Sequence, residues 1–243
     1  MKKQVNLDKN GVPYLDWNDI EDKAEEVIRY FGKGVLENPG RTPLCYYLEE
    51  LKKQFKLVFE YAKDLGCNAD GKKILGTTSQ KPLGIYIDSS LKEDPRLCFT
   101  LAHEFGHLVL HRDIDLKRIG YAEQAMIDTQ IDLISGHRQL RTPREWIEWQ
   151  ANYFAGAILM PRDTVKDYVI RLQKDAGIIR NQGTIYLDKQ STNLAAYIEI
   201  QRHLQRVYGV PGVTVEYRLK DLRILNDRRE EDVRHISELF KTR

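Results

Sequence analysis

The sequence predicts an α+β fold with one small sheet among helices, and three observations support this. Three short strand-like runs follow one another between Lys56 and Asp88 and are separated by turn-rich stretches. Helix-period patterns precede these runs and continue almost to the C-terminus. Of the 243 residues, 42% are apolar, which is enough for the core of one large domain, or of a medium domain with an appendage.

The charge composition excludes two classes of protein. With 38 Lys and Arg against 36 Asp and Glu, the net charge is +2, so the chain as a whole is not a strongly basic nucleic-acid binder. Its charges are also too balanced and too interspersed for a disordered tail. The sequence has no apolar leader segment and no apolar stretch of about 18 residues, so we expect a cytoplasmic protein with no membrane partner.

The N-terminal region predicts a polar arm followed by two helices. Residues 1–16 are polar and carry turn residues, so they are expected to form the arm. Asp16 or Asn18 can cap a helix over residues 19–30, which has apolar residues along one face. After a Pro-Gly break, a second helix is expected to begin behind Pro43 and to direct apolar residues toward a core.

The strand-like runs lie at Leu57–Tyr61, Ile74–Thr77 and Leu83–Ile87. They follow one another closely and are separated by turn residues, which favours a small antiparallel meander as the simplest way to pair them. Gly84 within the third run predicts a bulge or a close backbone approach, with a plain strand glycine as the alternative.

Two helices with distinctive signals follow the sheet. Residues 95–111 present a nearly continuous apolar surface, so this helix is expected to be buried on most sides. A second helix starts with Thr142 as its cap, a proline in the first turn and Glu145 at the capping-box position, and it should continue to Leu159. Residues 112–141 between the two helices are too weakly patterned for an assignment.

The C-terminal third predicts further helices and one hairpin. The hairpin is suggested by an Asn-Gln-Gly turn between two short apolar runs, and two of the helices by threonines at cap positions. The expected elements are a helix over residues 163–176, a hairpin over residues 178–187, a helix from Thr192 to Tyr208 and a helix from Thr214 to about Leu225.

The strongest chemical signal is the pentad at residues 103–107, which reads His-Glu-Phe-Gly-His. On a helix, His103 and His107 lie one turn apart on the same face, so both imidazoles can reach one metal ion. Glu104 is offset by one residue, which places its carboxylate beside a metal-bound water and suits it to act as a general base. The alternative is a pair of ordinary core histidines on a buried helix.

A third ligand is needed, because a catalytic zinc site takes three protein ligands and leaves one position open. Glu148 and Asn152 lie four residues apart on the helix that Thr142 caps. Glu148 could complete a His-His-Glu set, and Asn152 could orient a ligand histidine. The alternative is that Glu148 is simply an exposed residue of its helix. The apolar character of that helix face argues against this alternative, since a carboxylate near it needs a partner. The competing carboxylate, Glu145, is explained by its capping position.

His111 and the cysteines are not expected to bind this metal. His111 lies two turns beyond His103, a helical rise of about 12 Å, which is too far for one tetrahedral site. It is therefore expected to be structural or to support a ligand from behind. The three cysteines lack a Cys-x-x-Cys spacing, which argues against a disulfide framework and a cysteine-based zinc site.

Two sequence blocks carry a resemblance to a known family. Residues 100–111 and residues 148–155, followed by Leu-Met-Pro at 159–161, look like the ImmA/IrrE family of zinc metallo-endopeptidases, and a looser similarity covers residues 19–161. This resemblance implies a zincin-like metallopeptidase core, in which a small antiparallel sheet accompanies the helices that carry the His-Glu-x-x-His motif and the downstream glutamate.

The same resemblance implies a metal site and a reaction. Zn²⁺ would be held by His103, His107 and Glu148, and Glu104 would act as the catalytic base of peptide hydrolysis. Asn152 and His111 stay outside this ligand set and are expected to support it.

The resemblance also implies a partner. Several members, typically from bacteria, phages and mobile elements, cleave a helix-turn-helix repressor and thereby switch on stress or excision genes. We expect a substrate segment to add as a β-strand to the run at Gly84, Ile85 and Tyr86. A metallopeptidase domain is expected over residues 1–165, and a mainly helical extension over residues 166–243 resembles the family's helix-turn-helix-like tail only loosely.

A non-catalytic regulatory protein is the competing interpretation. Its metal site would be structural or vestigial, and residues 192–243 would contact DNA or a repressor. Basic residues in this tail motivate the alternative, but acidic residues interleave with them. A solvated helical face is therefore the favoured explanation, and direct DNA binding is not expected. A non-specific scavenging protease is disfavoured by the family resemblance alone.

Overall fold

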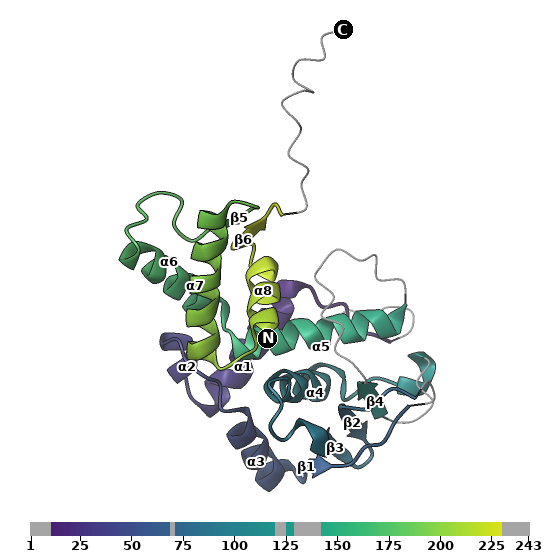
Figure 1. Cartoon of the computed structure of the whole chain (residues 1–243). Helices are drawn as coiled ribbons and strands as arrows, with labels where there is room; N and C mark the ends of the chain where they lie inside the picture. The colour runs from purple at the N-terminus through teal and green to yellow at the C-terminus, as the bar shows by residue number, and fades with distance from the viewer. Residues whose placement is uncertain (1–10, 69–70, 120–124, 129–141, 230–243) are drawn as a thin grey trace.

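The structure is a computed structural model, and it describes residues 11–68, 71–119, 125–128 and 142–229 (Figure 1). In chain order these residues form α1 (Trp17–Phe31), α2 (Gly34–Glu37), α3 (Leu44–Phe55), β1 (Val58–Lys63), β2 (Gly76–Gln80), β3 (Leu83–Asp88), α4 (Leu97–His111), β4 (Ala125–Asp128), α5 (Pro143–Leu159), α6 (Arg162–Asp175), β5 (Ile185–Leu187), α7 (Ser191–Tyr208), α8 (Gly212–Asp221) and β6 (Leu225–Asp227). The architecture is α+β, as the sequence predicts.

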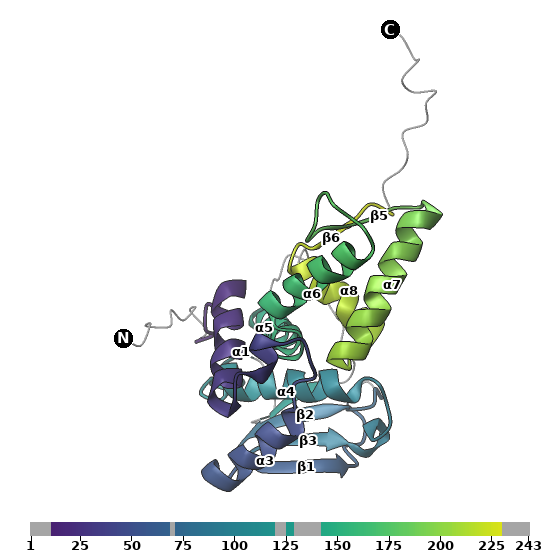
Figure 2. The same ribbon diagram turned by 90° about the vertical axis from the view of Figure 1, so that its left-hand side faces the viewer.

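The larger sheet is mixed, with the strand order β1-β3-β2-β4. β3 pairs antiparallel with β2 but parallel with β1, where Phe59 lies opposite Ile85. The expected antiparallel meander is therefore wrong at β1. The segment between β1 and β2 is long enough to carry the chain past the position of β3, whereas only a tight turn would force neighbouring antiparallel strands. Ile85 and Ile87 of the central strand are fully buried, and Figure 2 shows α4 running across the sheet.

The helices α4 and α5 begin and end close to the positions predicted from the sequence. α5 starts with the full capping box, in which Thr142 accepts from the Glu145 backbone N–H and Glu145 accepts from the Thr142 N–H. Asp16 and Asp19 form the corresponding box at the start of α1. Because a capping box uses only local contacts, its residues can be recognised without knowledge of the fold.

The hairpin predicted over residues 178–187 is wrong. β5 instead pairs in parallel with β6, so that Ile185 lies opposite Leu225 at the far end of the C-terminal region. Asn181 and Gly183 do adopt positive φ angles, so the turn exists, but it leads into a strand with a distant partner. The helix expected to reach Leu225 ends at Asp221, because Leu222 and Arg223 form a turn, with Arg223 at a φ of 57°, before β6 begins at Leu225.

Two predicted helix caps are also wrong. The cap of α7 is Gln190 rather than Thr192, and the cap of α8 is Pro211 rather than Thr214. Pro211 has a φ of −61° and an extended ψ, which ends the preceding segment and starts the helix earlier than a threonine cap would. The body of each helix is nevertheless where periodicity predicts it.

One apolar cluster joins the elements on both sides of α5. It includes fully buried residues of α1, the sheet, α4 and α5, and also residues of α6, α7 and α8 such as Val165, Leu204 and Leu219. The boundary expected near residue 165 stays a prediction. In the described ranges, no helix combines the length and the apolar character needed to cross a membrane.

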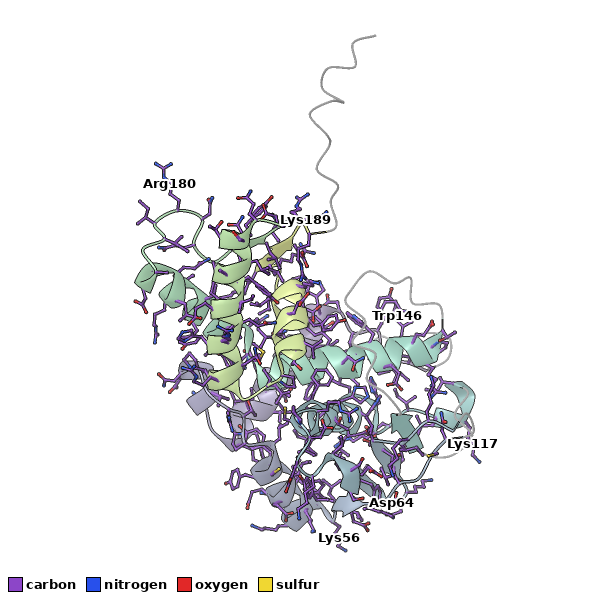
Figure 3. The ribbon with its side chains drawn as sticks, in the orientation of Figure 1. Lys56, Asp64, Lys117, Trp146, Arg180 and Lys189 are labelled. Carbon is purple, nitrogen blue, oxygen red and sulfur yellow. The ribbon has the colours of Figure 1, made fainter. Side chains whose placement is uncertain are left out.

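The part of the expected N-terminal arm that the structure describes packs against α5. Val12 is buried in a small apolar cluster with Ile147, and the ring of Tyr14 lies 5.9 Å from the ring of Trp146. Trp146 is labelled on α5 in Figure 3. The Pro13 carbonyl accepts a hydrogen bond of 2.8 Å from Gln150 Nε2, so residues 11–16 are held at a defined place on α5.

A buried ion pair connects α8 to α1. Arg218 donates to both carboxylate oxygens of Glu21, at 2.6 and 2.9 Å, and both residues are 1% exposed. Arg218 also donates to the Met160 carbonyl, and Tyr153 donates to Glu21. Burial raises the pKa of Glu21, but Arg218 outweighs it and holds that pKa below its usual value. Both charges are thus paired and hydrogen-bonded inside the protein.

We predict that Arg218→Met destabilises the protein by about 3–5 kcal/mol, because it leaves the Glu21 carboxylate buried without its partner. Urea unfolding followed by circular dichroism measures this loss. The control is Arg202→Met, which removes a mostly exposed ion pair with Glu199 at 3.8 Å and should change stability little. The double variant Glu21→Leu/Arg218→Met should recover much of the loss, since it removes both charges; a double variant as unstable as Arg218→Met would contradict the explanation.

Candidate metal centre

Three donor atoms from α4 and α5 converge at one point. His103 Nε2 and His107 Nε2 are 3.0 Å apart, and Glu148 Oε2 lies 3.2 Å from the first and 3.5 Å from the second. The histidines come from successive turns of α4, and Glu148 comes from α5, which packs beside it. The structure therefore brings together the three residues that the sequence predicts as ligands.

The spacing of these atoms fits a bound metal ion. Donors around a tetrahedral ion with bonds of about 2.0–2.1 Å lie about 3.3–3.4 Å apart, and the observed separations of 3.0, 3.2 and 3.5 Å lie on either side of this value. Two imidazoles and one carboxylate are also a ligand set found in catalytic metal sites that keep an open position. Within the described residues, His103, His107 and Glu148 form the one group of this kind.

Burial and charge favour the protonation states that metal binding needs. Burial lowers the pKa of His107, which outweighs the raising effect of Glu148. Burial raises the pKa of Glu148, but His107 and His103 outweigh it and the pKa lies well below its usual value. Neutral imidazoles and an ionised carboxylate are the metal-binding forms. The Glu148 side chain is 24% exposed and the histidines only 2% and 1%, so Glu148 is the donor residue most accessible to solvent.

Glu104 follows His103 directly on α4, and its side chain lies against β2. It is fully buried, and the Thr78 hydroxyl lies 2.6 Å from its Oε2. Gly76 of β2 makes room for its side chain, because a Cβ there would lie only 2.6 Å from Glu104 Oε1. The roles of Thr78 and Gly76 could not be predicted from the sequence, since nothing local marks which strand faces α4.

Asn152 orients His103, as the spacing on α5 suggests. Its Oδ1 lies 2.9 Å from His103 Nδ1. Because an amide oxygen only accepts, the ring nitrogen donates, and the proton of the neutral imidazole is held at Nδ1. The lone pair of His103 Nε2 is then directed toward His107 and Glu148.

His111 lies behind His107 and outside the donor triangle. It is fully buried, its Nδ1 is 3.0 Å from His107 Nδ1, and its Nε2 is 2.9 Å from Gln150 Oε1. Burial, followed by the influence of His107, lowers the pKa of His111 to about 3, so it is neutral. Gln150 is not among the residues predicted from the sequence, although a glutamine on the apolar face of α5 is a signal that such a partner exists.

The expected substrate strand is placed differently from the sequence-based hypothesis. Gly84, Ile85 and Tyr86 belong to β3, which is paired with β1 on one side and with β2 on the other. The backbone of β3 therefore has no edge to which a substrate could add, and strand addition at these residues is wrong. Of the strands that the structure describes in this sheet, β1 and β4 lie at the edges.

A comparison with protein families matches residues 68–220 to the IrrE N-terminal-like domain, Peptidase_M78. A search of curated proteins finds no match. The matched segment covers more than half of the chain and includes α4 with its two histidines, α5 with Glu148, and the strands β2 and β3 beside them. With the donor triangle and the family match together, the chain belongs to the ImmA/IrrE family of Peptidase_M78 metallopeptidases.

Proposed function

We propose that this protein is a zinc-dependent endopeptidase of the cytoplasm and that its substrate is a helix-turn-helix repressor. One observation carries the proposal: the donor atoms of His103, His107 and Glu148 converge with the spacing of a metal site, and Glu104, which follows His103 directly on α4, is fully buried. The family match supports peptidase chemistry. The repressor is the partner that the family resemblance suggests.

Zinc is the metal that this donor set favours. Two imidazole nitrogens and one carboxylate oxygen suit zinc, whereas Mg²⁺ and Ca²⁺ prefer oxygen ligands alone. Bound by His103, His107 and Glu148, zinc would polarise the scissile carbonyl and lower the pKa of a water molecule in the open position.

Glu104 transfers the proton in this reaction. It takes a proton at its carboxylate as the water oxygen bonds to the carbonyl carbon, and it delivers that proton to the amine nitrogen as the C–N bond breaks. The Thr78 hydroxyl, 2.6 Å from Glu104 Oε2, holds the carboxylate in place between the two events. Asn152 holds the His103 ring so that its Nε2 faces the metal position.

The first test uses Glu104→Gln and a candidate repressor. The amide cannot accept the proton, so cleavage should fall by about 10²–10⁴-fold while metal binding persists. The repressor is incubated with wild type and with the variant, each with and without chelator, and the products are separated by gel electrophoresis and mass spectrometry. Cleavage by Glu104→Gln at the wild-type rate would contradict the mechanism. Binding of the repressor without cleavage by wild type would favour the regulatory alternative.

A second prediction concerns the carboxylate ligand. Glu148→Ala should lower zinc occupancy, because it removes one of the three donors. Metal content is measured on the dialysed protein by mass spectrometry. Glu145→Ala is the matched control, since it removes a carboxylate from the same helix that serves the capping box and not the donor triangle. Unchanged zinc in Glu148→Ala would remove this residue from the ligand set.

A third prediction concerns the space that Gly76 leaves for the base. Gly76→Ala should displace Glu104 and reduce cleavage by about a hundredfold, since a shift of about 1 Å can have that effect, while zinc content stays the same. Peptidase rate and metal content are measured on one preparation. Gly34→Ala is the control, because an added Cβ there meets no atom within 4 Å. Full activity of Gly76→Ala would show that Glu104 is not confined by β2.

A further inference from the structure

We propose that a chain of hydrogen bonds from the N-terminal arm through Gln150 and His111 fixes the tautomer of His107 and so directs its Nε2 lone pair toward the metal position. His111 is then a positioning residue, which acts through His107 without touching metal or substrate. The inference deepens the proposed function and rests on it for the identity of the metal. The hydrogen-bond chain itself can be tested without any metal.

The donor-to-acceptor direction of this series of hydrogen bonds is set at the Pro13 carbonyl. A carbonyl only accepts, so the Gln150 nitrogen Nε2, 2.8 Å away, must donate to it. This fixes the orientation of the amide and leaves Gln150 Oε1 facing His111 Nε2 at 2.9 Å. Val12, the neighbour of Pro13, is buried in a small apolar cluster with Ile147, which keeps this carbonyl in place on α5.

His111 transmits this orientation to the ligand. Since Gln150 Oε1 only accepts, His111 Nε2 carries the proton and donates. His111 is fully buried, and the partners of its two ring nitrogens, Gln150 Oε1 and His107 Nδ1, carry no negative charge, so burial favours the neutral ring. Its other nitrogen, Nδ1, then has no proton and can only accept. It lies 3.0 Å from His107 Nδ1, which must therefore donate. The proton of a neutral His107 is thus at Nδ1, and its Nε2 has a free lone pair.

These hydrogen bonds produce a site that a bound cation would stabilise. Asn152 holds the proton of His103 at Nδ1 in the same way. Both Nε2 atoms and Glu148 Oε2 are then acceptors that face one another at 3.0 to 3.5 Å. Three mutually repelling lone pairs at this distance are stabilised by a positive charge between them, which a metal ion supplies.

Burial makes this arrangement depend on His111. Gln150 and His107 are each 1% exposed and His111 is fully buried, so loss of the acceptor at His111 leaves the His107 N–H unsatisfied inside the protein. The His107 N–H could then find a new partner only if the ring turned or its proton moved to Nε2. Either change leaves no Nε2 lone pair directed at the metal position. Partners of this kind behind a ligand histidine are worth about 10–100-fold in metal affinity.

The test compares two substitutions at one position. His111→Phe keeps a flat ring but has no acceptor, so zinc affinity should fall by about 10–100-fold, measured by competition with a chromogenic chelator. His111→Gln offers an amide oxygen to His107 and an amide N–H to Gln150, so it should keep an affinity close to wild type. Equal affinity of His111→Phe and wild type would overturn the proposal. An equally weak His111→Gln would overturn it too, since it would show a packing role alone.

A spectroscopic measurement covers the case in which His111→Phe fails to fold. In ¹⁵N-labelled wild-type protein at about pH 8, above the ordinary histidine pKa, a scalar coupling should connect the Nδ1 atoms of His107 and His111 across their hydrogen bond. Its absence in both metal-free and zinc-loaded protein would overturn the proposal. If wild type binds no metal but shows the coupling, the proposed function fails while the hydrogen-bond chain stands.

Discussion

The close approach of α4 and α5 at Gly106 is the contact on which the site depends. A Cβ at this position would lie 3.1 Å from the Phe154 ring and 3.2 Å from the Ala151 backbone, so a larger residue would require these atoms of α5 to move by a few tenths of an ångström. Glu148, on α5, lies within 3.5 Å of both histidines of α4, so its distance from them depends on the spacing of the two helices. The glycine inside the His-Glu-Phe-Gly-His pentad is therefore part of the metal centre, although it offers no ligand atom.

Helix geometry explains why so much of the site could be predicted from sequence. Two histidines four residues apart share a face wherever the helix lies, and the capping box at Thr142 defines the start of α5 by local contacts alone. Glu148 and Asn152 follow from the same rule once their helix is known. Gln150, Thr78 and Gly76 could not be identified, because their roles depend on partners on other elements.

The errors in the predicted fold have the same physical origin. β1 pairs in parallel with β3, and β5 in parallel with β6, and both pairings join segments that are separated by other elements. A parallel pair needs a long connection, so no turn residues between its strands identify it in the sequence. The antiparallel pair of β2 and β3, in contrast, is linked by a short turn. The run of apolar residues in β3, of which Ile85 and Ile87 are fully buried, is a signal of a strand in the interior of the sheet.

Helix α5 joins the metal centre to both ends of the described chain. Glu148 and Asn152 face the histidines, Gln150 links the Pro13 carbonyl to His111, and Tyr153 donates to the carboxylate that Arg218 neutralises. These polar groups are largely buried, so a partner lost from either terminal segment leaves an unsatisfied group on the helix that also carries the third metal donor. The N-terminal arm and α8 therefore contribute to the position of α5, and through α5 to the geometry of the metal site.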